Sequence, residues 1–203
     1  MERRPAFLAA AAVIALGIAL LIVAEFRQRA DDRRFDEAQL VLRETFGLFA
    51  DPAAIEPLPR NTVPPRDSAT PAAVAMLSIP SLDVDVAAVE YSDYEDLRTA
   101  VGYMPNSDLP GEPGITYFVG HRTGYGAPFR RLDELSPGDV ISVTTVTGAI
   151  VRYNVTFVEV KQPTEPIPEL NRLKGVSNLL LVTCHPEYST EFRLIVGAVA
   201  TVS

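Results

Sequence analysis

The chain has few of the residues that build cross-links and metal cages. Among its 203 residues there is one cysteine, and there are two histidines. The single Cys184 excludes an intramolecular disulfide, and with only His121 and His185 a Cys-rich or His-rich zinc site cannot be assembled. Basic residues are also scarce, 18 against 26 acidic ones, for a formal net charge of -8. Because nucleic-acid binding requires a basic face, we expect no nucleic-acid partner.

Apolar residues are in excess at the N-terminal end. The mean hydropathy is +0.13 although 22% of the residues are charged. Residues 6–24 form a run of nineteen residues without a charged or polar side chain. As a helix this run would be about 28 Å long, close to the roughly 30 Å hydrocarbon core of a bilayer. We therefore expect residues 1–24 to be a signal anchor that crosses the membrane at 6–24 and contacts lipid.

A cleaved signal peptide is the alternative for this end of the chain, since Arg3 and Arg4 supply a positive n-region. The apolar run is longer than a usual h-region, however, and residues 25–27 are not the small residues that cleavage prefers. Further arginines on the far side of the run oppose Arg3 and Arg4 under the positive-inside rule. Charge alone therefore leaves the orientation open.

The segment 25–71 is expected to connect the anchor to the rest of the chain. Residues 25–50 are highly charged, and their apolar residues recur at spacings of three and four: Phe35, Leu40, Val41, Leu42, Phe46 and Phe49. This pattern predicts a juxtamembrane helix. It is either a stalk or membrane-surface helix or, as we favour, a solvated helix that spaces the domain from the lipid. Residues 51–71 contain six prolines, which predicts an extended linker.

The remaining residues, 72–203, predict a mainly β domain. Short β-branched runs alternate with turn signals at Val74–Ile79, Val84–Val89, Ile115–Val119, Val140–Thr145, Ile150–Val160, Leu179–Thr183 and Phe192–Val199. One short helix is expected at Tyr94–Ala100. Many short strands separated by Pro and Gly favour a closed barrel or a sandwich. This domain has 16 acidic and 9 basic residues, so it carries about -7 of the net charge.

Three residues with catalytic chemistry end or begin apolar runs in this domain. Cys184 ends the run from Leu179, Arg193 begins the next run nine residues later, and His121 follows the run Ile115–Val119. A thiol needs a nearby base or cation to become a nucleophilic thiolate, because few free thiols are ionised at neutral pH. Each residue alone has an ordinary structural explanation: a buried Cys, a solvated Arg or a loop His. Together they allow a catalytic Cys/His pair, and spacing alone does not decide between these interpretations.

These residues resemble the signature of the sortase family of cysteine transpeptidases, in which a Thr-x-Thr-Cys strand end is followed by an Arg and preceded by a His. Here the signature reads Leu181-Val182-Thr183-Cys184, with Leu181 where the family often has Thr. The surrounding motifs are Gly120-His121-Arg122-Thr123-Gly124-Tyr125-Gly126-Ala127-Pro128-Phe129, Leu132-Asp133-Glu134-Leu135 and Thr183-Cys184-His185-Pro186-Glu187-Tyr188-Ser189. The combination is most similar to the class E sortases of actinobacteria.

The resemblance implies an eight-stranded sortase-type β-barrel with short helices, preceded by the transmembrane helix and linker. It also implies that Cys184 attacks the Thr carbonyl of an LPxTG-like or LAxTG-like sorting signal on a secreted protein. His121 would act as acid and base, and Arg193 would bind substrate or stabilise the oxyanion. The acceptor would be an amine of a peptidoglycan precursor. No cofactor and no metal are implied.

The remaining candidates are substrate contacts. We expect Thr183, His185, Tyr125 and Tyr188 to line the substrate groove, although the two tyrosines could equally pack on the barrel edge. His185 is next to the nucleophile in sequence, but neighbouring residues of a strand point to opposite faces, so His121 is the preferred base.

Function then fixes the orientation: a single-pass protein of the cell membrane, with Met1 in the cytoplasm and residues 72–203 outside. Two other functions are open: another exported Cys/His enzyme, such as a peptidase or L,D-transpeptidase, and a non-catalytic β-barrel binding domain. The Ser-His-Gly-Cys motif of L,D-transpeptidases is missing.

Overall fold

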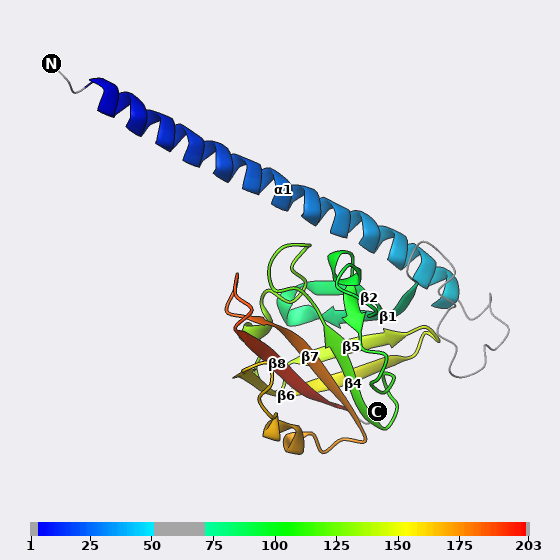
Figure 1. The fold of residues 1–203 in the computed structure, drawn as a ribbon. Helices are drawn as coiled ribbons and strands as arrows, with labels where there is room; N and C mark the ends of the chain where they lie inside the picture. The colour runs from blue at the N-terminus through cyan, green and yellow to red at the C-terminus, as the bar shows by residue number, and fades with distance from the viewer. Residues whose placement is uncertain (1–3, 51–71, 202–203) are drawn as a thin grey trace.

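The computed structural model describes residues 4–50 and 72–201 (Figure 1). The expected linker, residues 51–71, lies outside the described residues. Within them the chain forms α1 (Arg4–Ala50), β1 (Ala73–Ile79), β2 (Val84–Glu90), β3 (Val101–Tyr103), β4 (Gly114–Val119), β5 (Val140–Thr145), β6 (Ile150–Lys161), β7 (Ser177–His185) and β8 (Phe192–Ala200). Short 3-10 helices lie in the connections: η1 (Pro80–Leu82), η2 (Asp96–Arg98), η3 (Leu132–Glu134) and η4 (Pro168–Arg172).

The strands close into a barrel with the order β1-β2-β3-β4-β7-β8-β6-β5. Most neighbours are antiparallel, but β2 pairs with β3 and β4 pairs with β7 in parallel. The parallel pairing of β4 and β7 matters most for function, because it brings the carboxyl ends of two strands that are distant in sequence to the same place. The expected eight-stranded barrel is confirmed.

The pattern of apolar residues in each strand reflects whether one or both faces of the barrel wall are buried there. Strand β1 alternates, with Ala73, Ala75, Leu77 and Ile79 buried and the residues between them partly exposed. Strand β7 is buried on both faces over Ser177–Thr183. Its inward residues join the barrel core, and its outward residues lie beneath the β6–β7 connection. This double burial explains why β7 is a continuous apolar run rather than an alternating one.

Each expected strand is present, with ends within two residues of the predicted bounds. Strand β3 is an additional strand that no sequence pattern predicted. It has only three residues, Val101-Gly102-Tyr103, and a glycine at its centre, so it is too short to show a period of two. The expected helix at Tyr94–Ala100 is a single 3-10 turn, η2.

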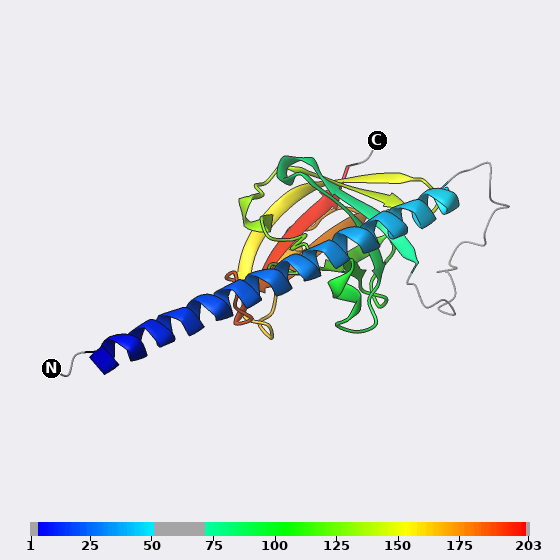
Figure 2. The same cartoon turned by 90° about the horizontal axis from the view of Figure 1, so that it is seen from above.

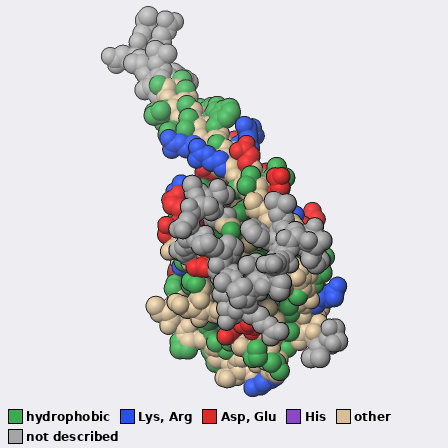
Figure 3. Space-filling view, turned by 90° about the vertical axis from the view of Figure 1, so that its right-hand side faces the viewer, with side chains coloured by type: hydrophobic (Ala, Val, Ile, Leu, Met, Phe, Trp, Pro, Cys, Tyr) green, Lys and Arg blue, Asp and Glu red, His purple; other side chains and the backbone are tan. Residues whose placement is uncertain are grey.

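Helix α1 has two parts with different surroundings. Its apolar part is exposed, and the described span Ala11–Gly47 includes a window long and apolar enough to cross a membrane. This part projects beyond the barrel (Figures 1 and 2). In Figure 3 its apolar side chains give way to charged ones where the helix reaches the domain.

The second part of α1 packs on the barrel. Phe35, Leu42 and Phe46 are buried against it, and Gln39 is buried between them. Full burial of three large apolar side chains corresponds to roughly 4.5–9 kcal/mol before entropy costs. Gln39 Nε2 donates to Thr99 O at 2.8 Å, and Ala87 N donates to Gln39 Oε1 at 2.6 Å. The expectation of a solvated spacer is therefore wrong, because Phe35, Leu42 and Phe46 have the barrel as their partner, although Leu40 and Val41 are exposed.

Candidate functional site

Cys184 and Arg193 face each other across two strands. They are directly paired in the antiparallel β7–β8 register. Side chains of such a pair lie on the same face, with Cβ atoms about 4.5–5.5 Å apart. The Arg193 guanidinium is held from behind, since its Nη1 donates to Thr190 O at 2.9 Å and to Phe192 O at 3.0 Å. Arg193 therefore shares the barrel face of Cys184, with its guanidinium held by the β7–β8 connection.

His121 reaches the same place through the parallel pairing of β4 and β7. Val119 pairs with Val182, and Gly120 N continues the ladder by donating to Val182 O at 3.2 Å. One residue on, Thr183 Oγ1 donates to Gly120 O at 2.8 Å. These bonds tie the residue before the histidine to the residue before the cysteine. The structure thus brings together Cys184, His121 and Arg193.

Two tyrosines enclose the His121 ring. Tyr94 meets it edge-on with ring centroids 5.1 Å apart, and Tyr125 lies against it at 4.9 Å with an interplanar angle of 36°. The Arg98 guanidinium lies over the Tyr125 ring, 5.3 Å from its centroid. Burial, followed by the neighbouring Tyr125 and Cys184, raises the pKa of Tyr94. Tyr94 therefore belongs to the site, near both His121 and Cys184.

The surroundings of His121 favour its neutral form. Burial lowers the pKa of His121 below its ordinary value, and the Arg98 cation lowers it further. Its Nε2 atom is buried and forms no hydrogen bond with any of the described residues. The imidazolium, when it forms, is therefore a stronger acid than an exposed histidine.

The loop that follows His121 is closed tightly. Phe129 N donates to His121 O at 3.1 Å, and the Phe129 ring packs so close to Gly120 that a Cβ there would lie 2.7 Å from Phe129 Cδ2. Arg122 is buried and pairs with Asp133 at 2.9 Å. These contacts explain the Gly-His-Arg…Phe…Asp spacing, because each of these residues closes the loop on the barrel wall.

An apolar layer lies on the outer barrel face that also carries Cys184. Alternation puts Val182 and Cys184 on one face of β7, and Ile195 and Arg193 on one face of β8. The layer consists of Phe157, Leu180, Val182 and Ile195 from the strands and Leu173 from the β6–β7 connection, with Ile167 and Leu170 packed on it. Burial raises the pKa of Tyr117 on β4, and the nearby Arg193 cation opposes the rise. The layer extends to the Cys184–Arg193 pair.

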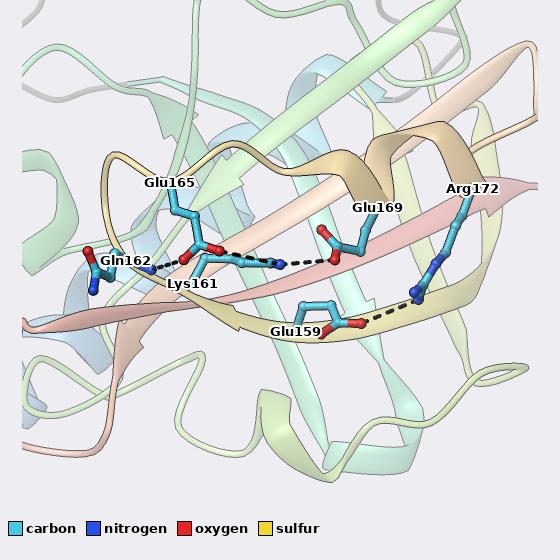
Figure 4. A network of polar contacts seen from close by, with 6 residues as sticks. All are labelled: Glu159, Lys161, Gln162, Glu165, Glu169 and Arg172. Atoms are coloured by element: carbon cyan, nitrogen blue, oxygen red, sulfur yellow. Dashed lines mark hydrogen bonds and ion pairs between the residues drawn. The ribbon is translucent and has the colours of Figure 1, made fainter.

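An ion network fixes the connection that covers this layer (Figure 4). Lys161 Nζ lies 2.9 Å from Glu169 Oε1 and 3.8 Å from Glu165 Oε1, and its side chain is only 14% exposed. Arg172 pairs with Glu159 at 3.3 Å. The hydrogen bond from Lys161 lowers the pKa of Glu169. Lys161 at the end of β6 therefore holds η4 down on the barrel.

The four expected substrate contacts have different surroundings. Tyr125 lies against His121. Thr183 is buried, and its hydroxyl is bonded to Gly120 O rather than facing a groove. His185 is the last residue of β7, so it points to the face opposite Cys184, as its neighbouring position predicts. Tyr188 is 78% exposed in the β7–β8 connection.

Tyr94 and Arg98 are the site residues that sequence reasoning missed. They lie in the β2–β3 connection, far from the three catalytic motifs in sequence. Their only signal is the predicted short helix at Tyr94–Ala100. Across residues 4–50 and 72–201, no three His, Cys, Asp or Glu side chains gather as a metal-binding group.

Comparison with known proteins agrees with this geometry. The family model for the sortase domain matches residues 77–201, more than half of the chain. Sortase SrtE1 of Streptomyces coelicolor is 32% identical over 135 residues, which cover 60% of this chain and 38% of that protein. Sortase D of Bacillus subtilis is 32% identical over 114 residues, covering 56% of this chain and 55% of that protein. The chain thus spans about two fifths and just over half of these two relatives.

A solved structure gives the same result. The crystal structure of Sortase E1 from Streptomyces coelicolor with a tripeptide in the active site superimposes with a TM-score of 0.58 and 30% identity, covering 64% of this chain and 88% of that one. The resemblance to class E sortases is confirmed. The chain belongs to the sortase family of cysteine transpeptidases.

Proposed function

We propose that this protein is a membrane-anchored sortase that cleaves a sorting signal between Thr and Gly and transfers the secreted protein to an amine of a peptidoglycan precursor. The observation that carries the proposal is the meeting of Cys184, His121 and Arg193 at the ends of β7, β4 and β8. The signal is LPxTG-like or LAxTG-like, by family membership. The tripeptide in the active site of the similar Sortase E1 supports a peptide substrate.

In the first half-reaction Cys184 is the nucleophile. Its thiolate attacks the Thr carbonyl carbon, and the electron pair of the C=O bond moves to oxygen. When the tetrahedral intermediate collapses, the C–N bond breaks and the His121 imidazolium gives its proton to the departing Gly amine. The products are a Cys184 thioester and a free Gly-ended peptide. The low pKa of His121 suits this step, because a stronger acid protonates the leaving amine more readily.

The second half-reaction reverses the roles. Neutral His121 takes a proton from the incoming amine, whose nitrogen attacks the thioester carbonyl. The thiolate of Cys184 leaves, and an amide bond to the acceptor remains. Thiolate and imidazolium are then restored, so the cycle needs no cofactor.

Arg193 stabilises the negative charge that develops in both steps. Its Nη1 is occupied by two backbone carbonyls of the β7–β8 connection. Nε and Nη2 donate to no acceptor in the part of the chain that the structure describes, so they serve the oxyanion or the substrate backbone. A donor of this kind contributes about 3–4 kcal/mol in other acyl-transfer enzymes.

The substrate binds beside Cys184 and Arg193, at the edge of the apolar layer that the β6–β7 connection covers. Tyr125 and the exposed Tyr188 contact it from two loops. His185 points to the face opposite Cys184 and is therefore not among these contacts. Thr183 acts instead as the tie between β7 and β4, which its hydrogen bond to Gly120 O supports.

The proposed organisation is an anchor at residues 1–24, a juxtamembrane helix and linker at 25–71 and a catalytic domain at 72–203. The apolar helix supports a single membrane pass. Met1 is cytoplasmic, because secreted substrates and wall precursors lie outside. A C-terminal reporter that is active only outside the cell tests this orientation, and activity of a cytoplasmic reporter would contradict it.

A peptide-cleavage assay tests the reaction. The full chain in detergent micelles is incubated with quenched fluorescent Leu-Pro-x-Thr-Gly and Leu-Ala-x-Thr-Gly peptides, with and without an amine acceptor. We expect cleavage after Thr and an amide product with the amine, and loss of both in Cys184→Ala. Cleavage by Cys184→Ala at the wild-type rate, or cleavage at another bond, would overturn the assignment.

A further inference from the structure

The second part of α1 reaches the loop that follows His121. Asp32 Oδ1 accepts a hydrogen bond from Gly126 N at 3.0 Å, although the two residues are 94 positions apart. Phe35, one turn later, is 4% exposed and packs against Gly126 so closely that a Cβ there would lie 2.3 Å from Phe35 Cδ1. One face of the helix that continues from the apolar segment thus holds the centre of the loop.

The loop needs this support because of its backbone. Four consecutive residues have positive φ: 68° at Gly124, 49° at Tyr125, 69° at Gly126 and 43° at Ala127. This conformation is easy for glycine but costs free energy at Tyr125 and Ala127. Such a conformation persists only where surrounding contacts over-determine it. The hydrogen bond from Ala127 N to Gly124 O closes the turn from within, and α1 closes it from outside.

The supported loop carries the ring that packs on the histidine. Tyr125 is the neighbour of Gly126, and its ring lies 4.9 Å from His121. The Tyr125 ring also meets Arg98, the last residue of η2. The next residue, Thr99, accepts a hydrogen bond from Gln39 of α1. Helix α1 therefore supports both residues packed near His121: Tyr125 through its neighbour Gly126, and Arg98 through its neighbour Thr99.

We propose that Asp32 and Phe35 are positioning residues for His121, so that the helix leaving the membrane completes the active site. The proposal rests on the proposed function, in which His121 moves the proton. Asp32 is eight residues beyond Ala24, the last residue of the apolar run, or about 12 Å along the helix. The same contacts therefore keep the histidine loop near the membrane surface.

The test uses the full chain in detergent micelles or nanodiscs, with kinetics and NMR on the same samples. The variants are Phe35→Ala, Asp32→Ala and Asp32→Asn, and the matched control is Leu40→Ala, which removes an apolar side chain that is 68% exposed on the same helix. Asp32→Asn keeps a side-chain oxygen to accept from Gly126 N. Since the chain has two histidines, a His185→Gln variant assigns the His121 ring proton for titration by NMR.

We expect Phe35→Ala and Asp32→Ala to lower kcat about ten- to a hundredfold with little change in KM, since a misplaced catalytic group costs rate rather than binding. The pKa of His121 should rise toward its ordinary value, because the ring loses burial. Asp32→Asn should recover most of kcat, and Leu40→Ala should match the wild type.

Two results would overturn the proposal. In the first, Phe35→Ala and Asp32→Ala both keep the wild-type kcat and the wild-type titration of His121. In the second, Leu40→Ala loses as much kcat as these two variants do. Asp32→Ala decides the question if Phe35→Ala fails to fold. If the wild type itself transfers no peptide, the proposed function fails, and the NMR titration still tests whether α1 sets the surroundings of His121.

Discussion

The hydrogen bond from Thr183 to Gly120 offers a sharp test of the site, because it joins the neighbours of the two catalytic residues. In Thr183→Val a methyl group replaces the hydroxyl at nearly constant volume. The change removes a buried hydrogen bond of 2.8 Å and leaves the carbonyl of Gly120 without this donor. Losses of this kind cost about 1–3 kcal/mol of folding free energy.

Thr116 supplies the matched control. It lies on β4, is 1% exposed, and its hydroxyl forms no hydrogen bond within residues 4–50 and 72–201. Thr116→Val therefore removes a buried, unpaired polar group, which should leave stability unchanged or raise it. The two variants have the same chemistry and similar burial, so their difference isolates the bond to Gly120.

The assays are thermal unfolding and peptide cleavage. For a chain of this size 2 kcal/mol corresponds to a Tm change of about 4–8 °C. We expect the Tm of Thr183→Val to fall by about this amount. Its kcat/KM should fall about ten- to a hundredfold, because His121 and Cys184 move apart. Equal losses of Tm in Thr183→Val and Thr116→Val, or full activity in Thr183→Val, would refute the reasoning.

Two further predictions concern charges near the site. Because the Arg98 cation lowers the pKa of His121, Arg98→Met should raise that pKa and move the acidic limb of the kcat/KM profile to higher pH; an unmoved limb would contradict this. Lys161→Met removes the cation shared by Glu165 and Glu169, so amide exchange in residues 162–176 should speed up and KM for the peptide should rise; the exposed Lys174→Met is the control, and equal effects would contradict the role of the network.

The strands were predictable from the sequence because apolar residues in barrel strands either alternate with polar ones or form a short continuous run. Strand β1 alternates, and β7 is a continuous apolar run. Strand β3 has three residues and is held by pairing with β2 and β4, which no local pattern reveals. The number of strands, eight, came from resemblance to a family and not from periodicity, and their order is known only from the structure.

The site was predictable only in part. Cys184, His121 and Arg193 end or begin apolar runs and match a signature, so they could be named in advance. Tyr94 lies on a different connection and reaches His121 only through the closure of the barrel. Its place in the site depends on tertiary packing, which the sequence does not display.

The juxtamembrane helix shows the same limit. The spacing of Phe35, Leu42 and Phe46 predicted a helix with an apolar stripe, but not what covers it. A stripe of this kind fits lipid, solvent-facing clusters or a protein surface equally well. Here the deciding feature is Gln39, whose amide matches two backbone groups of the barrel.

The most direct test of the account is mass spectrometry of the full chain mixed with a sorting peptide in the absence of an acceptor amine. We predict that Cys184 gains the mass of the peptide up to Thr and that hydroxylamine releases it, as expected for a thioester. The adduct should be absent in Cys184→Ala and should accumulate slowly in His121→Ala. Peptide cleavage by the wild type without any adduct on Cys184, under conditions that preserve thioesters, would contradict the central claim.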